Sequence, residues 1–367
     1  MAETDEDTLP DTATTEDEPP LSRARIGRIM EAVEAEDRER LWSETEPLHA
    51  ADIADLLEQI GSNDRRRVIA LYGREFDGDI LSELDESIRE EVIGLLQPQV
   101  LAEAVRDLES DDVVDLVEDL QDDQQEAILD ILAAPERLAV QQSLTYPEYS
   151  AGRLMQREVV MAPEHWTVGD MIDFMRRAET LPEQFYHVML VDPRLHPVGN
   201  VMLGRVMASR RETPLGEIME ETFHTFAVTD PEADVAYAFN QYHLISAPVV
   251  DEEGRLVGVI TIDDAMSVLD EEHEEDILRL AGVGEEGGLS GRLVEAIRDR
   301  AIWLFVNLLT AILASVVIEQ FAATIERMVA LAVLMPIVAS MGGNAGTQTM
   351  TVAVRALATR DLTARNA

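Results

Sequence analysis

Cysteine and lysine are both absent from this 367-residue sequence, and aromatic residues make up only 5% of it. Without cysteine the chain can form no disulfide and has no thiolate nucleophile, which suits a reducing interior. All 29 basic residues are therefore arginine, and they face 73 Asp and Glu, so the formal net charge is −44. A protein with this much negative charge repels nucleic acid and attracts cations, so no nucleic-acid partner is expected.

The excess of acid has two explanations. Proteins that work in high salt carry acidic surfaces for solubility, and an arginine-only basic set fits a GC-rich genome. Composition alone therefore does not separate a halophilic acidic protein from one with dedicated cation sites. Residues 1–21 are acidic and rich in Pro and Thr and have no apolar h-region. They are expected to form a disordered acidic tail, and no signal peptide is expected.

Charge is nearly missing from one part of the chain, since residues 301–318 and 328–354 contain no charged side chain. Runs of about 20 apolar residues span a bilayer, so two transmembrane helices are expected at about 301–321 and 328–356, in a partial membrane domain of residues 300–367. Arginines flank the pair on the outside, whereas the short connection has only Arg327. The positive-inside rule then gives a multi-pass protein of the cell membrane with cytoplasmic N-terminal domains. The alternative is a pair of buried helices in a soluble core.

Residues 22–148 are expected to be all-α and superhelical (solenoid-like). The segment "LHAADIADLLEQIGSNDRRRVIALY" from Leu48 aligns without gaps on "LESDDVVDLVEDLQDDQQEAILDIL" from Leu108, with apolar positions matched at helical spacing. Asp112 and Asp115 fall one helical turn apart and are candidate metal ligands. A solvated helix face is the alternative for this pair.

Residues 149–274 change to an α+β pattern, in which short β-rich segments alternate with helices. The segments "TFHTFAVT", "PEADVAYAFNQYH", "ISAPVV" and "GRLVGVIT" follow the same strand–helix–strand–strand order as the segments between residues 158 and 202. In this repeat Gly199 corresponds to Gly258. Two tandem βαββα units are therefore expected, at residues 149–214 and 215–274.

These units resemble a tandem pair of CBS domains, a regulatory fold that often binds adenine nucleotides such as ATP. The T-x-x-D motif that holds ribose and phosphate in that fold is matched by Thr261 and Asp264. The first unit has Met202 and Arg205 at those places, so the resemblance implies at most one ordinary nucleotide site.

The whole order of segments is similar to the MgtE family of magnesium channels and transporters. It comprises acidic helical repeats, "YSAGRLM" (149–155), the CBS pair, "DEEHEEDILRLAG" (270–282), two apolar runs with "GGNAGTQ" (342–348), and "RALATRDL" (355–362). The resemblance implies a homodimer in a lipid bilayer, with Mg²⁺ as transported ion and regulator. Residues 275–299 match the family's connecting or plug helix. Since the family has five membrane helices, the sequence is expected to be a fragment.

Carboxylates crowd the predicted helix that follows the second CBS unit. Asp263, Asp264, Glu272, Glu275 and Asp276 can approach one helix face, with a bend expected around His273. Like charges this close repel, and a divalent cation relieves the repulsion. The alternative is a solvated acidic linker, but the resemblance implies that acids here bind intracellular Mg²⁺.

Pro336 and several glycine and amide residues interrupt the second apolar run. Proline and glycine weaken a helix, so a break is expected that frees backbone carbonyls where the chain lines a wet cavity. Mg²⁺ prefers hard oxygen ligands, so a pore lining is expected from Pro336, Gly343, Asn344, Gly346 and Gln348. The alternative is close helix packing through the small residues.

The sequence therefore predicts magnesium transport across a membrane by a Mg²⁺-gated Mg²⁺ channel whose cytosolic acidic domains sense Mg²⁺ and close the pore. The alternative is a membrane-anchored CBS-type adenine-nucleotide sensor without transport of its own. An enzyme is not expected, because the chain has no Walker loop, nucleophile elbow or Cys/His metal cluster.

Overall fold

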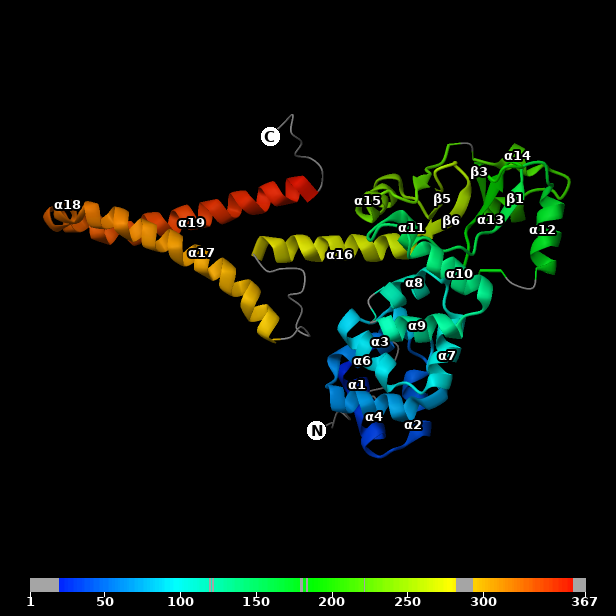
Figure 1. Cartoon of the computed structure of the whole chain (residues 1–367), viewed down its shortest axis with the longest axis horizontal. Coiled ribbons are helices and arrows are strands. Elements are labelled where there is room, and N and C mark those ends of the chain that lie inside the picture. The colour runs from blue at the N-terminus through cyan, green and yellow to red at the C-terminus, as the bar shows by residue number, and fades with distance from the viewer. Residues whose placement is uncertain are drawn as a thin grey trace, which may run out of the picture. The chain divides into compact units, whose positions relative to one another are not determined.

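The computed structural model describes residues 20–118, 120, 122–178, 181–182, 184–220, 222–281 and 293–358. The chain divides into two compact units (Figure 1). The first contains the residues up to Tyr146 and also Gln156–Glu158. The second contains Pro147–Met155 and the residues from Val159 onward.

The first unit is the all-α domain that the sequence predicts. Its elements are α1 (Arg23–Glu34), α2 (Arg38–Thr45), α3 (Ala50–Gln59), α4 (Ser62–Tyr72), the 3₁₀ helix η1 (Gly73–Glu75), α5 (Asp79–Ser82), α6 (Glu86–Leu95), α7 (Pro98–Asp107), α8 (Ser110–Glu118), α9 (Asp122–Ile131) and α10 (Ala134–Ser143). Buried aliphatic side chains from successive helices form one continuous core. Such a core is what stacked short helices need, because none of them buries its apolar face alone.

The helices of this unit follow a short period. From Ala50 the helix starts fall on a 12-residue grid, at residues 50, 62, 86, 98, 110, 122 and 134, and η1 covers the missing step near residue 74. Seven of these steps are one helix of nine to eleven residues, whereas the step near residue 74 holds the short η1 and then α5, which starts off the grid at Asp79. The alignment of Leu48 on Leu108 in the sequence therefore spans five such steps.

Two buried arginines occupy equivalent places on this grid. Arg65 in α4 donates from Nε to the carbonyl of Leu57 at 2.8 Å and from Nη2 to that of Ile60 at 3.1 Å, and it pairs with Glu91. Arg89 in α6 repeats the arrangement.

Arg89 donates to the carbonyls of Leu84 at 3.2 Å and Ser82 at 3.5 Å, and its Nη1 lies 2.6 Å from Asp115 Oδ2. Each guanidinium thus satisfies carbonyls at the end of the preceding helix, which lack intrahelical partners, and ties them to a later helix.

The second unit begins with the two βαββα units. Its elements there are α11 (Ala151–Leu154), β1 (Met161–Pro163), α12 (Val168–Arg177), β2 (His187–Val191), β3 (Pro197–Met202), α13 (Leu203–Ala208), α14 (Leu215–Ile218), β4 (Phe226–Ala227), α15 (Glu232–Tyr242), β5 (Ser246–Val250), β6 (Leu256–Thr261) and α16 (Ile262–Ala281). The strands form two sheets, β1-β2-β3 and β4-β5-β6.

The two sheets repeat each other residue for residue, as the sequence predicts. Leu190 pairs with Gly199 in the first hairpin and Val249 pairs with Gly258 in the second, each beside a bulge. The two hairpin turns also match. Leu195 has φ 67° and its counterpart Gly254 has φ 77°, so one left-handed position is filled by glycine and the other by leucine at a steric cost.

The segment that precedes each βαββα unit forms backbone hydrogen bonds with the other βαββα unit. The backbone N–H groups of Ala151 and Gly152 donate to the carbonyls of Asp230 at 2.8 Å and Val228 at 3.0 Å. In the opposite direction, the N–H of Leu215 donates to the carbonyl of Trp166 at 2.7 Å. The "AGRLM" segment is therefore a structural connection between the two halves.

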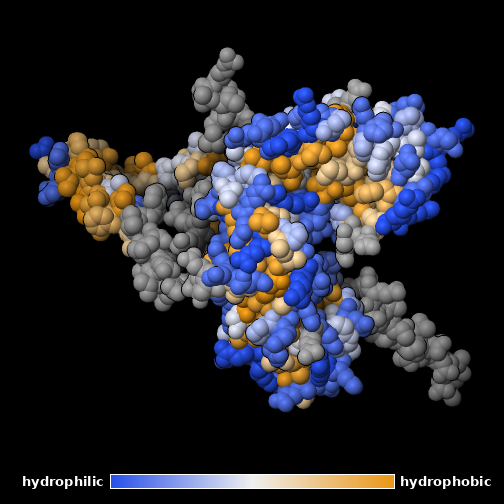
Figure 2. Space-filling model, turned by 45° about the vertical axis from the view of Figure 1, so that its right-hand side comes forward, coloured by the Kyte–Doolittle hydropathy of each residue, from blue (hydrophilic) through white to orange (hydrophobic). Residues whose placement is uncertain are grey.

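The last elements are α17 (Leu293–Gln320), α18 (Ala322–Arg327) and α19 (Val329–Ala358) (Figure 1). Figure 2 shows a largely hydrophobic surface over these helices. One helix among the described residues, Val329–Ala356, is long and apolar enough to cross a membrane, and Leu304–Gln320 is a shorter apolar segment. The break expected at Pro336 is wrong: α19 is one continuous helix. Proline removes a single N–H donor, and the Ala, Leu and Met residues around it favour helix strongly enough to continue it.

Candidate functional site

The T-x-x-D residues meet where β6 ends and α16 begins. The hydroxyl of Thr261 lies 2.7 Å from Asp264 Oδ2 and also contacts Asp263 Oδ1, and the Thr261 N–H points to Asp264 Oδ2 at 3.4 Å. Thr261 is only 8% exposed. Thr261 stands before the first turn of α16 and donates to the carboxylate three residues later, which is one half of a capping box.

Two carboxylates lie within reach of the Thr261 hydroxyl. A hydroxyl has one proton, so it can donate to only one of the two aspartates at a time. Three oxygens, from Thr261, Asp263 and Asp264, therefore converge on one point at the end of the sheet. Such a set suits a hard cation or the hydroxyls of a ribose.

The other predicted acids of α16 lie further along the helix. Glu272 is half-buried, eight residues after Asp264, which corresponds to about 12 Å along the axis. The two carboxylates therefore cannot bind the same ion. The side chains of Glu275 and Asp276 lie outside the described residues. The helix runs without interruption through His273, where the sequence predicts a bend.

The predicted pair of aspartates in the first unit has a different environment. Asp115 is 58% exposed at its side chain and carries the ion pair with Arg89. Asp112 lies in the first turn of α8 and its N–H donates to Asp111 Oδ1 at 3.0 Å. Arg89 therefore already supplies a cation to Asp115, which any metal ion would have to displace. The described residues include no group of three His, Asp or Glu placed to hold a metal.

The first CBS unit lacks an equivalent oxygen cluster. At the matching positions it has Met202, which is 41% exposed, and Arg205, whose Nη1 lies 3.8 Å from Glu220 Oε1.

His187 and Ser246, at matching positions of the two halves, contact each other, and sequence analysis missed this pair. His187 Nδ1 lies 2.7 Å from Ser246 Oγ. Burial lowers the pKa of His187, and the negative charge of Glu220 opposes that effect. The only sequence signal is the spacing, because the two residues begin the equivalent strands β2 and β5.

We expect His187 to make the CBS pair acid-sensitive. In the unfolded chain histidine titrates near 6.5, whereas the folded state holds it neutral to lower pH. The unfolded state therefore binds more protons as pH falls below about 6.5, and stability decreases. Depressed aspartate pKa values, such as that of Asp192 beside the N–H of His196, act in the same direction but below about pH 4.

His187→Asn should remove the loss of stability that sets in as the pH falls below about 6.5. The measurement is the ratio of amide exchange rates in β2 and β5 between parent and variant at each pH from 7 to 5. As the pH falls, amide exchange in the parent should become faster relative to exchange in the variant. A ratio that stays constant over this range would contradict the assignment.

The predicted pore residues all lie on α19. Pro336, Gly343, Asn344, Gly346 and Gln348 are exposed, and a Cβ added at Gly343 or Gly346 would meet nothing within 4 Å. The described residues therefore place no second helix against this small-residue face. Asn344 and Gln348 lie one turn apart on the continuous helix.

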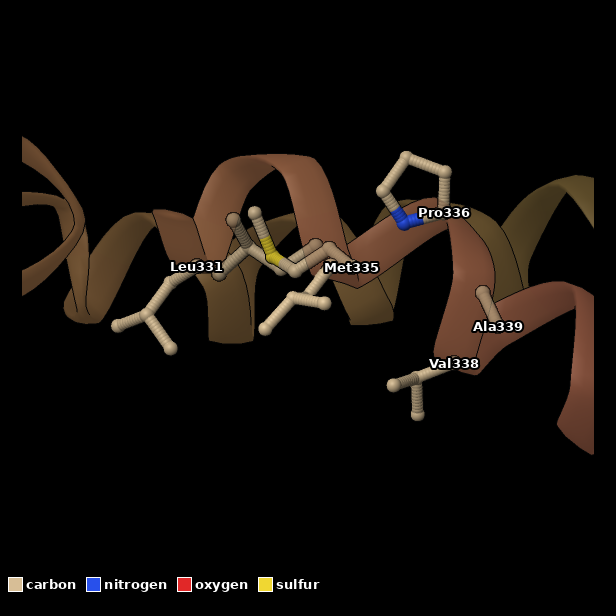
Figure 3. Close-up of a pocket in the computed structure, with 7 residues that line it drawn as sticks. Leu331, Met335, Pro336, Val338 and Ala339 are labelled. Carbon is tan, nitrogen blue, oxygen red and sulfur yellow. The ribbon is translucent and has the colours of Figure 1, made fainter. Parts of the chain in front are cut away.

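Pro336 also lines an apolar groove of about 700 Å³ between α19 and Ile318 of α17 (Figure 3). Leu331, Met335, Val338 and Ala339 form much of its wall. Such exposed apolar surface is typical of a helix that meets lipid or other helices.

Comparison with known proteins finds matches in parts of both units. Residues 48–149 match the MgtE intracellular N domain, and residues 215–271 match the CBS domain. The magnesium transporter MgtE of Thermus thermophilus is 34% identical over 236 residues, which cover 63% of this chain and 52% of that protein. MgtE of Enterococcus faecalis is 30% identical over 222 residues, which cover 60% of this chain and 49% of that protein.

A solved structure agrees with these matches. The cytosolic domain of the Mg²⁺ channel MgtE in complex with ATP superposes with a TM-score of 0.62 at 29% identity, covering 66% of this chain and 99% of that one. This chain spans about half the length of the curated relatives it matches. In its helical N domain and its CBS region, the chain is therefore similar to the MgtE magnesium transporters.

Proposed function

We propose that this chain takes part in magnesium transport across a membrane as the sensing part of a Mg²⁺-gated channel. The observation that carries the proposal is the similarity of its helical and CBS units to MgtE of T. thermophilus, a magnesium transporter. The apolar helices α17 and α19 support a membrane location, with the acidic units on the cytoplasmic side.

The proposed sensor is built from carboxylates. At low Mg²⁺, repulsion among the candidate acids of α16 (Asp263, Asp264, Glu272, Glu275 and Asp276) and those of α8 (Asp112 and Asp115) favours an open arrangement of the units. At high Mg²⁺ the cation bridges carboxylates and stabilises a closed arrangement. Mg²⁺ must bind the closed state more tightly, since a ligand with equal affinity for both states shifts nothing.

The proposed membrane part uses the oxygen-bearing face of α19. Asn344 and Gln348 would line the ion path with amide oxygens, and Gly343 and Gly346 would let another helix or a hydrated ion approach closely. The predicted connecting or plug helix, residues 275–299, includes residues 282–292, which lie outside the described residues, and its role stays a prediction. A homodimer in the bilayer is part of this proposal.

Limited proteolysis of the chain, with Mg²⁺ titrated at constant ionic strength, tests the sensor. We expect saturable protection that extra KCl does not reproduce, because fixed ionic strength separates specific binding from screening. Asp264→Ala and Glu275→Ala should raise the Mg²⁺ concentration needed for protection about tenfold, whereas Asp270→Ala, on the same helix, should leave it unchanged.

Two outcomes would count against the sensor. Equal protection by any salt would indicate a halophilic surface. Unchanged protection in both Asp264→Ala and Glu275→Ala would remove these acids from the mechanism.

A nucleotide-sensing role is the second candidate, and the Thr261–Asp264 cap favours it. The related cytosolic domain of MgtE was crystallised with ATP. If this role dominates, ATP without Mg²⁺ should raise the melting temperature of the chain, and Asp264→Ala should abolish the shift. Protection by Mg²⁺ alone would favour the channel.

A further inference from the structure

Three consecutive residues leave the second unit to join the first. Gln156–Glu158 belong to the helical unit, although the residues on both sides, Met155 and Val159, belong to the second unit. The chain therefore crosses between the units three times. If this segment were released, only one crossing would remain.

Each of the three residues holds the helical unit by its own polar contacts. Gln156, which is 2% exposed, donates from its amide to Glu109. Arg157 donates from Nε to Ser143 Oγ at 3.2 Å and from Nη1 to Gln142 Oε1 at 3.2 Å.

Glu158 accepts from the hydroxyl of Ser110 at 2.7 Å and from its N–H at 3.4 Å, and the N–H of Arg157 donates to Ser110 Oγ at 2.8 Å. Ser110 is the first residue of α8. Glu158 thus places a carboxylate at the N-terminus of α8, where a negative charge is favourable, although it lies 48 residues away in sequence.

We propose that Gln156–Glu158 is a strap that docks on the ends of α8 and α10 and opens as a unit without unfolding the helical domain. Its contacts are polar and side-chain mediated, whereas the helices beneath it are held by the apolar core. Because such segments open at a lower free energy than a core, the strap sets how freely the two units can move relative to each other. The proposal does not depend on which ion or nucleotide the chain binds.

The absence of cysteine allows a direct test by thiol labelling of the full chain. Three single-cysteine reporters are needed. Gln156→Cys reports on the strap, His165→Cys is an exposed reference, and Thr45→Cys, at a position 1% exposed in α2, reports opening of the helical core. Each reporter is combined with Arg157→Ala, and separately with the milder Glu158→Gln and Ser110→Ala.

We expect the thiol of Gln156→Cys to react at least about tenfold more slowly than that of His165→Cys. Each strap substitution removes a hydrogen bond to a charged group, so it should accelerate labelling of Gln156→Cys roughly tenfold or more. The labelling rate of Thr45→Cys should not change. Labelling of Gln156→Cys as fast as His165→Cys would show that no docked strap exists. Equal acceleration of Gln156→Cys and Thr45→Cys would show that the segment opens only with the core, which also overturns the proposal.

Discussion

Arg65→Ala should lower the free energy of opening of the helical unit by about 3 kcal/mol, because truncating a buried, paired charge is costly. The side chain is 5% exposed, and it satisfies two carbonyls that end α3 as well as Glu91. Alanine leaves these carbonyls without a donor in a place that water does not reach.

The measurement for Arg65 is native-state amide exchange of Val68 and Ile69, which lie in the same helix and are buried. A loss of about 3 kcal/mol corresponds to exchange roughly 150-fold faster. Arg66→Ala is the matched control, because its neighbouring side chain is exposed and surface substitutions typically change stability by less than about 0.5 kcal/mol. Equal effects of the two substitutions would refute the role given to Arg65.

A second large effect is expected at Gly78, which precedes α5. A Cβ built there would lie 2.3 Å from the carbonyl oxygen of Ala104, a backbone atom of α7. No rotamer change relieves a backbone clash, so α7 must shift. Gly78→Ala should therefore destabilise the unit by about 1–3 kcal/mol.

Gly94→Ala provides a control with the opposite sign. Gly94 lies in α6, and a Cβ there meets nothing within 4 Å. Alanine is the better helix former, so this substitution should stabilise by up to about 1 kcal/mol. Amide exchange in α6 and α7 measures both variants. Destabilisation by Gly94→Ala, or none by Gly78→Ala, would contradict this account of close packing.

Helices and strands could be predicted where the sequence pattern that specifies them lies within a short stretch of the chain. The strands β2, β3, β5 and β6 alternate with helices in a repeated order, and hairpin pairing placed Gly199 and Gly258 as expected. The T-x-x-D spacing of Thr261 and Asp264 was also readable, and the structure adds the contact between the two side chains. Both inferences rest on interactions between residues close in sequence or in a repeated register.

The helical unit was predicted only in outline. The spacing of its apolar residues indicated helices. The 60-residue offset between Leu48 and Leu108 did not reveal the shorter 12-residue period, because connections of about two residues between helices leave little signal in the sequence. The prediction of a break in α19 was wrong. It assumed that the low helix propensity of Pro336 is enough to interrupt the helix. A single missing donor is outweighed when the surrounding residues favour helix.

By itself, the sequence determined composition, charge, the order of the elements and the resemblance to MgtE, because these depend on residue type and spacing. The tertiary structure decided which groups lie together. It paired Arg89 with Asp115, placed Glu158 on the N-terminus of α8, and brought His187 to Ser246. Such contacts join residues 26 to 59 positions apart, so they depend on where each helix ends and how its neighbours pack, which no local pattern specifies.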